Sequence, residues 1–255
     1  MRLADRVAVI TGGGRGIGRA IALALAQEGA HLVLASDVER EVEAAAAEAS
    51  ALGRKALAIR VDVRRSDDMA EMARRAVAEF GSLDILVTCA GIDGSGLMLQ
   101  QDEAEWRRVI DVNLVGTYLA ARAVLPQMML QKAGRIITIS SAFGKHGGYG
   151  FITAYAASKH GVIGLTRSLA AELGSLGHPE ITVNAICPGY VRAGMGIKPQ
   201  KVKDREGRIT EIPGDELFER YLKRRVPQRR MLEAEEVANV AVFLALPETR
   251  GMTGQ

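Results

Sequence analysis

Residues 6–18 read RVAVITGGGRGIG, and this stretch decides the fold. Its first half is a short apolar run, typical of a strand that is buried on both faces. Its second half carries Gly12, Gly16 and Gly18, and a helix is predicted to begin near Ile17. Glycines permit a tight turn and a close backbone approach to a pyrophosphate, and the helix start offers free N–H groups. The stretch therefore predicts a dinucleotide-binding loop, the alternative being a glycine-rich turn without a ligand.

The alternation of strand and helix continues along the chain. Further apolar runs of strand length lie at 31–35, 56–63, 83–88, 134–140 and 181–187. Helix-like segments lie at about 16–28, 39–52, 66–80, 103–130 and 154–174, and two more, 217–226 and 233–246, follow a long irregular segment. This order predicts an α/β fold, a doubly wound parallel sheet (Rossmann fold) with helices on both faces. We expect a single domain, 1–255, with a substrate lid at about 190–230.

Bulk composition narrows the function classes. The net charge of +3 gives no reason to expect a nucleic-acid partner. Cys89 and Cys187 form no CxxC pair, which argues against a metal site or a disulfide framework. The first apolar run is too short for a signal peptide, and apolar stretches of membrane-spanning length are interrupted by charges. We expect a cytoplasmic protein that binds no metal, membrane or nucleic acid.

A tyrosine and a lysine stand one helical turn apart in YAASK, residues 155–159. One interpretation is structural, because such pairs are common on solvated helix faces. The other is chemical. A phenol with a pKa of about 10 is a poor acid at neutral pH, and an ammonium one turn away would lower that pKa. Tyr155 and Lys159 could then move a proton to or from a substrate oxygen.

TGGGRGIG followed about 140 residues later by YAASK resembles the short-chain dehydrogenase/reductase family, and the resemblance covers Asp5 to Gln255. It implies hydride transfer between a nicotinamide cofactor and a small-molecule secondary alcohol or its ketone. Tyr155 would be the general acid/base, and Lys159 would lower its pKa and bind the nicotinamide ribose. Ser141 of ISSAFG would hold the substrate oxygen, and Asn113 of DVNLVG would fix a proton-relaying water.

The resemblance also implies a nucleotide site. Its residues would be Gly12, Arg15, Gly16, Ile17, Gly18, Ser36, Asp37, Asp62, Val63, Ala90, Gly91, Tyr155, Lys159, Pro188, Gly189 and Val191. Two positions depart from the family pattern. Cys89 replaces a frequent asparagine and is interpreted as a small buried residue rather than a reactive thiol. Ala193 replaces a common threonine, so the nicotinamide amide would rely on backbone groups near Val191.

Two clues to the choice of nucleotide conflict. Family members that use NAD tend to carry an acid at the end of the second strand, which bonds the ribose and repels a 2′-phosphate. Asp37 stands one residue late for that role, with Ser36 in the usual acidic position. Arg15 matches a base that NADP users often have. We favour NAD, because a carboxylate beside a phosphate is costly whereas Arg15 can point to solvent.

The sequence determines the substrate less well than it determines the nucleotide site. Residues 192–230 contain 12 basic and six acidic side chains, which favours either an ordinary solvated lid or an anionic substrate. The loop after Ser141, one residue longer than usual, offers His146, Tyr149 and Phe151 as contacts. The 4% aromatic content argues against a large flat substrate. The leading hypothesis is NAD-dependent turnover of a polyol, sugar derivative or other anionic hydroxy compound. The alternatives are an NADPH-dependent 3-oxoacyl thioester reductase and, less favoured, a non-catalytic dinucleotide-binding regulator.

The resemblance carries two further expectations. Most family members are homotetramers built on paired long helices, here 103–130 and 154–174, so we expect a homo-oligomer, either a tetramer or a dimer. Family sequences usually run past TGQ into a last strand, so a sequence that stops at Gln255 is expected to be a shortened one.

Overall fold

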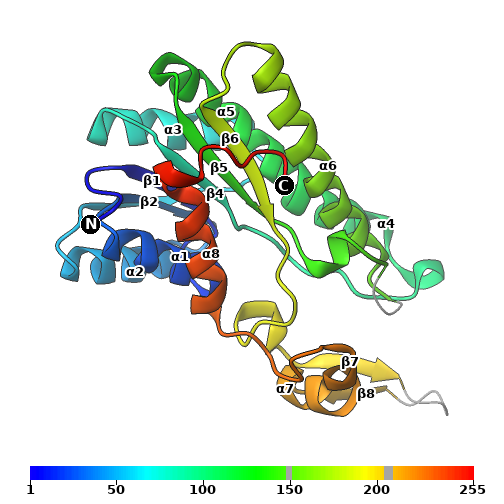
Figure 1. Ribbon diagram of the computed structural model, residues 1–255. Coiled ribbons are helices and arrows are strands. Elements are labelled where there is room, and N and C mark those ends of the chain that lie inside the picture. The colour runs from blue at the N-terminus through cyan, green and yellow to red at the C-terminus, as the bar shows by residue number, and fades with distance from the viewer. Residues whose placement is uncertain (148–150, 204–208) are drawn as a thin grey trace.

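The computed structural model describes residues 1–147, 151–203 and 209–255. Its main sheet has six parallel strands in the order β3-β2-β1-β4-β5-β6 (Figure 1). The strands are β1 Val7–Thr11, β2 His31–Ser36, β3 Ala56–Arg60, β4 Ile85–Thr88, β5 Gly134–Ile139 and β6 Ile181–Ile186. Each lies within or next to a predicted apolar run, and the doubly wound fold is confirmed.

Helices cover both faces of this sheet (Figure 1). One face carries α1 Gly16–Gln27, α2 Glu39–Ala51 and α8 Ala234–Ala245, and the other carries α3 Ser66–Phe80, α5 Gly116–Gln131 and α6 Thr153–Ser175. Alternate residues of a strand point to opposite faces. Ala8 and Ile10 of β1 therefore pack under α1, whereas Val7 and Val9 pack on the opposite side. All four are buried, which is why the strand reads as a continuous apolar run.

The helix predicted over 103–130 is divided. It consists of α4, Glu103–Ile110, and α5, joined by a π-helical turn over Asp111–Val115 that contains Asn113. Such turns are rare and are frequent at functional sites. The helical segment predicted over 103–130 is confirmed, and only the π-helical turn within it was not predicted, because the extra residue in the turn leaves no mark on the apolar pattern.

Among the described residues, one helical run, Glu103–Gln131, is long and apolar enough to cross a membrane by length and composition. Its α5 part packs against the sheet, with Ala120, Val124 and Met128 at 0% exposure. We therefore interpret this run as a core element of the doubly wound fold.

The segment between β6 and α8 lies beyond the carboxyl ends of the strands, apart from the sheet (Figure 1). It contains the antiparallel pair β7 Gln200–Lys203 and β8 Ile209–Ile212, then α7 Gly214–Leu217, a π-helical turn Phe218–Leu222 and a 3₁₀ turn Lys223–Arg225. Helix was predicted for the last part only. The hairpin was missed because the charge-rich sequence QKVKDREGRITEI gives a weak strand signal.

The last residues of the sequence lie along β6. The Ala185 N–H donates to the Gln255 carbonyl at 2.7 Å, and the Gly254 N–H donates to the Val183 carbonyl at 2.7 Å. These bonds continue the sheet beside its edge strand, where the resemblance predicts a further strand.

Asp84 connects the starts of β1 and β4. Its carboxylate accepts hydrogen bonds from the Val7 N–H at 2.9 Å, the Ser82 hydroxyl at 2.9 Å and the Arg6 guanidinium at 2.8 Å. Asp84→Ala is expected to lower the free energy of unfolding by about 1–3 kcal/mol, because a part-buried N–H loses its partner. Urea denaturation measures this change. Asp84→Asn keeps one acceptor oxygen and should lose less, so equal losses in the two variants would contradict this account.

Candidate functional site

The crevice for a ligand lies at the carboxyl ends of β1 and β4, where the strand order reverses. The loop after β1 passes directly beside the loop after β4. Gly12 has φ 67°, and a Cβ there would lie 2.8 Å from the Ala90 Cα. A Cβ on Gly18 would lie 2.1 Å from the Gly12 carbonyl oxygen, so the helix start packs on the same loop. Only glycine allows either contact.

The first turn of α1 is open to an anion. Arg15 is the N-cap residue, and it makes no side-chain capping bond. Across the described ranges, no protein group accepts a hydrogen bond from the N–H of Gly16 or Ile17. Free N–H groups at a helix start, on a glycine-rich loop, suit a pyrophosphate. The residues present therefore fit a dinucleotide.

Asn113 is completely buried and ties the loop after β4 to α6. Its amide nitrogen donates to the Ile92 carbonyl at 2.9 Å and the Ser158 hydroxyl at 3.0 Å, and its amide oxygen accepts from the Ile92 N–H at 2.8 Å. The side chain is thus committed to protein groups. A relaying water would have to use the Asn113 main-chain carbonyl, which also accepts a hydrogen bond from the Thr117 hydroxyl at 2.8 Å.

Lys159 is 4% exposed and lies between the ends of the central strands. Its ammonium donates to the Ile139 carbonyl at 2.9 Å and lies 5.7 Å from the centre of the Tyr155 ring. Burial lowers the pKa of Lys159 to about 8, against small opposing effects of the thiols of Cys89 and Cys187. The group therefore gives up its proton far more readily than an ordinary lysine.

Tyr155 behaves differently from the expectation. Burial raises the pKa of Tyr155, the hydrogen bond with Ser141 opposes that rise, and the carboxylate of Asp93 adds to it. The expected lowering by Lys159 is absent in this structure, because the ammonium lies over the ring and bonds to a carbonyl. At neutral pH the phenol keeps its proton, as an ordinary phenol does, and it can donate that proton to a bound oxygen.

Ser141 caps a short 3₁₀ turn, Ala142–Gly144, and its hydroxyl accepts from the Phe143 N–H at 3.1 Å. The adjacent Ala142 N–H donates to the Pro188 carbonyl at 2.8 Å, which brings the loops after β5 and β6 together. The structure thus gathers Ser141, from the loop after β5, with Tyr155 and Lys159 of α6 into one cluster.

A second cavity, of about 400 Å³, lies at the ends of β2 and β3. Asp37, Arg60 and Asp62 line it, together with Val61, Arg64, Arg65 and Asp68. The Arg64 guanidinium donates to both carboxylate oxygens of Asp62, at 2.9 and 2.6 Å, and lowers the pKa of that carboxyl. An adenine amino group would therefore share Asp62 with Arg64. Sequence reasoning missed Arg60, whose place beside Ser36 depends on the register of two strands.

The other candidate residues lie in different surroundings, and not all of them lie where the sequence suggested. Arg15 does not simply point to solvent, since it lies 3.5 Å from the Glu41 carboxylate. His146 is exposed, with its ring 5.4 Å from that of Phe143, and Phe151 is 57% exposed. Tyr149 lies outside the described residues. Burial raises the pKa of the Cys89 thiol to about 11, consistent with the interpretation that this cysteine is not reactive.

The remaining nucleotide candidates lie on the same edge of the sheet. Val63 is buried beneath Gly116, where a Cβ would meet the Val63 side chain at 2.8 Å. A Cβ on Gly91 would lie 3.6 Å from the Lys159 ammonium. Val191 is buried and pairs with Leu232, and Gly189 beside it is exposed. Gly194, next to Ala193, approaches Gly16 so closely that a Cβ on Gly16 would lie 3.6 Å from the Gly194 nitrogen.

A doubly wound sheet, a glycine loop at its switch point and a Ser–Tyr–Lys cluster define a nicotinamide-dependent oxidoreductase that acts on a CH–OH group. Comparison with known proteins identifies the family. The sequence model described as short chain dehydrogenase matches residues 6–204, and the chain belongs to this family.

Relatives extend the likeness to nearly the whole chain. The 3-oxoacyl-[acyl-carrier-protein] reductase FabG of Staphylococcus epidermidis is 38% identical over 252 residues, which is 98% of this chain and 96% of the relative. The solved structure of an actinorhodin polyketide ketoreductase variant with NADPH superposes with a TM-score of 0.88 at 33% identity, covering 100% and 95% of the two chains. Levodione reductase superposes with a TM-score of 0.84 at 31% identity, covering 98% and 94%.

The buried charge of Lys159 provides a test of the site electrostatics. Below pH 8 the folded protein carries that charge at a cost. Between about 8 and 10.5 the folded protein has lost the proton that the unfolded chain still binds, so the cost fades as the pH rises. Lys159→Met is therefore expected to raise Tm at pH 7 by about 2–6 °C and by less at pH 9.5. Thermal melts measure both values, with the exposed Lys55→Met as control. An equal gain in Tm at pH 7 and at pH 9.5 would contradict a lowered pKa of Lys159.

Proposed function

We propose that this enzyme reduces the ketone of a 3-oxoacyl thioester to a secondary alcohol with NADPH. The observation that carries this proposal is the half-buried Tyr155, whose phenol is hydrogen-bonded with Ser141 and whose pKa is raised by desolvation. A ketone needs a proton on its oxygen when hydride reaches its carbon, and Tyr155 holds that proton at neutral pH. The name of the Staphylococcus epidermidis relative supports the thioester as substrate.

The proposed roles follow from the contacts. The nucleotide supplies the hydride. The hydroxyls of Ser141 and Tyr155 would both bond the ketone oxygen, and Tyr155 would transfer its proton as the alcohol forms. Lys159 would hold the ribose with the N–H groups that its bond to the Ile139 carbonyl leaves free. With a pKa of about 8, Lys159 can return a proton to Tyr155 near neutral pH.

An anionic polyol is less well supported than the sequence suggested. The basic excess of residues 192–230 is partly neutralised by ion pairs. Among the described side chains, Arg192 and Arg230 pair with acids outside that range, Glu233 and Glu236. Arg220–Glu216 and Lys223–Glu219 are pairs within the range, whose acids are already counted in the excess. The Asp93 carboxylate also acts on Tyr155 and would repel an anionic group there. This carboxylate and the name of the Staphylococcus epidermidis relative favour the thioester reductase over a sugar or polyol derivative.

The preference for NAD, which Asp37 suggested, finds no support in the comparisons, where the ketoreductase structure contains NADPH. Ser36 rather than an acid ends β2, and Arg60 lies beside it on β3. Arg15 lies close to the same region and is held by Glu41 at 3.5 Å, a long contact that a phosphate can displace. We therefore infer that Arg15 and Arg60 bind a 2′-phosphate, and that Asp37 opposes it.

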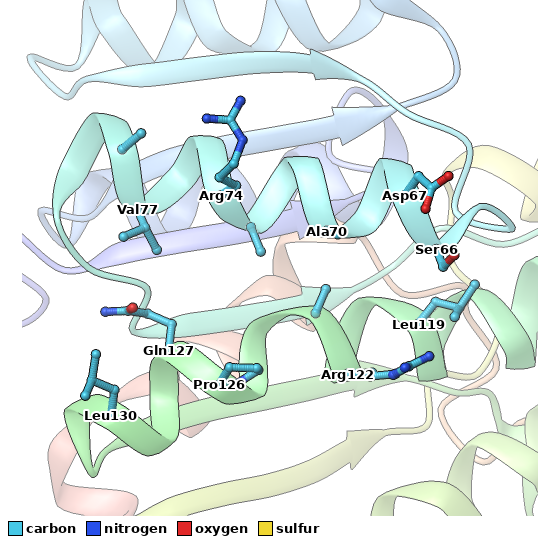
Figure 2. Close-up of a pocket in the computed structure, with 13 residues that line it drawn as sticks. Ser66, Asp67, Ala70, Arg74, Val77, Leu119, Arg122, Pro126, Gln127 and Leu130 are labelled. Carbon is cyan, nitrogen blue, oxygen red and sulfur yellow. The ribbon is translucent and has the colours of Figure 1, made fainter.

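A homo-oligomer and a cytoplasmic location remain predictions. On α5, Tyr118 is 44% and Leu130 is 77% exposed. A groove of about 810 Å³ between α3 and α5 continues this surface, with Val77, Leu119 and Pro126 among its lining residues (Figure 2). Apolar surface of this kind is typical of a subunit contact. Sedimentation equilibrium would distinguish a tetramer or dimer from a monomer.

Removal of the proton donor tests the enzymatic role. Tyr155→Phe is expected to lower kcat for acetoacetyl thioester reduction by about 100-fold or more, because no group then protonates the oxygen. The Kd for the nucleotide, followed by fluorescence, should change little. Tyr118→Phe on the exposed face of α5 is the control and should keep full activity. A wild-type protein that binds nucleotide but reduces no ketone would instead support a regulator.

The nucleotide preference has its own test, in which Kd values for NADPH and NADH are measured side by side. Wild type should bind NADPH more tightly. Arg15→Ala and Arg60→Ala should each weaken NADPH binding by about tenfold more than NADH binding, since each removes a partner of the phosphate. Asp37→Ala should strengthen NADPH binding. Arg122→Ala, on α5, serves as the charge control. Tighter binding of NADH by wild type would overturn the assignment.

A further inference from the structure

Aromatic side chains are scarce in this protein but are not evenly spread. The sequence contains five phenylalanines, five tyrosines and one tryptophan. Of these, Tyr155 and Phe143 belong to the candidate site, and Tyr190 and Phe218 connect it to the segment beyond β6. The low aromatic content argued against a flat substrate. The placement of these rings argues the other way, because they gather where a substrate would bind.

The rings form a continuous series that begins at the proton donor. The Phe143 ring lies 6.5 Å from Tyr155 at 75° and 6.1 Å from Tyr190 at 78°, both edge to face. Tyr190 in turn lies 5.5 Å from Phe218, which is 2% exposed and packs with Leu222 and Met231. Phe143 and Tyr190 are half-buried, so part of each ring remains accessible. These two rings therefore form a wall beside the phenol that holds the ketone oxygen.

The main chain at both residues of this aromatic wall is fixed by close contacts. The Phe143 N–H is bonded to Ser141, and a Cβ on the next residue, Gly144, would lie 2.5 Å from the Ser140 hydroxyl and 2.7 Å from the Lys159 carbonyl. On the other side, the Tyr190 carbonyl accepts the Leu232 N–H at 2.8 Å. The main chain that carries both rings is thus held relative to the reacting atoms, which favours discrimination between substrates.

We propose that Phe143 and Tyr190 make this reductase prefer 3-oxoacyl thioesters whose ketone carries a flat ring over those with a short straight chain. The inference rests on the proposed function. With the ketone oxygen on Ser141 and Tyr155, the group attached to the carbonyl carbon lies beside Phe143. A ring there gains edge-to-face contacts with two aromatic side chains, which an alkyl chain cannot make. Phe143 and Tyr190 determine specificity and take no part in the proton transfer.

The test uses two probes that share one thioester, the N-acetylcysteamine esters of 3-oxo-3-phenylpropanoate and acetoacetate, with NADPH. Wild type should show a kcat/KM about tenfold higher for the phenyl compound, an advantage of the size a well-formed apolar pocket gives. Phe143→Ala should remove that advantage, so that the ratio of kcat/KM for the phenyl compound to that for acetoacetate falls from about ten to about one. Phe143→Leu should be intermediate, and Tyr190→Leu should act in the same direction. Phe243→Ala, a 49% exposed ring on α8, is the matched control.

The outcomes separate the two proposals. Loss of the preference for the phenyl probe in either single variant, Phe143→Ala or Tyr190→Leu, supports the role of these two rings in specificity. If one variant fails to fold, the other still provides the test. Equal turnover of the two probes by wild type, or equal losses for both in the variants, overturns the wall while the proposed function stands. Failure of wild type to reduce either probe with NADPH or NADH overturns the proposed function and this inference with it.

Discussion

The site depends on one backbone approach, that of Gly12 to the loop after β4. A Cβ at Gly12 would lie 2.8 Å from the Ala90 Cα, and the positive φ at Gly12 disfavours any side chain. This contact holds the loops after β1 and β4 against each other at the point where the sheet reverses its strand order. The rest of the site is positioned from this contact. Gly18 packs on Gly12 and sets the start of α1, and Asn113 binds the backbone of Ile92 beyond Ala90 and joins it to α6.

Desolvation accounts for the chemistry of this arrangement. Lys159 and Tyr155 lie where the strands end, and burial moves their pKa values in opposite directions, down for the ammonium and up for the phenol. The neutral form of each group is favoured, which suits a pair that passes a proton to a ketone oxygen. Two basic side chains of the segment beyond β6, Arg192 and Arg230, pair with acids outside residues 192–230, and the Asp93 carboxylate acts on Tyr155 itself.

Much of the fold could be predicted because its signals are local. The predicted range of α3, 66–80, agrees with the observed Ser66–Phe80, since its apolar positions repeat at helical spacing. The π-helical turn at Asn113 and the hairpin of β7 and β8 were not predicted. The turn inserts a residue that the apolar pattern does not record, and the hairpin consists largely of charged residues. The aromatic wall was missed for another reason: Phe143, Tyr190 and Phe218 are far apart in sequence, and composition alone counts them without placing them.

The sequence by itself determined the strand, glycine loop and helix of residues 6–18, and the one-turn spacing of Tyr155 and Lys159. Both are short-range features, in which neighbouring residues dictate the local conformation. The tertiary structure decided what those residues experience. Burial among strands from the whole chain set the direction of the Tyr155 and Lys159 pKa shifts. Strand register placed Arg60 beside Ser36. Dielectric environment and register arise only when distant segments pack together, so no stretch of the sequence contains them.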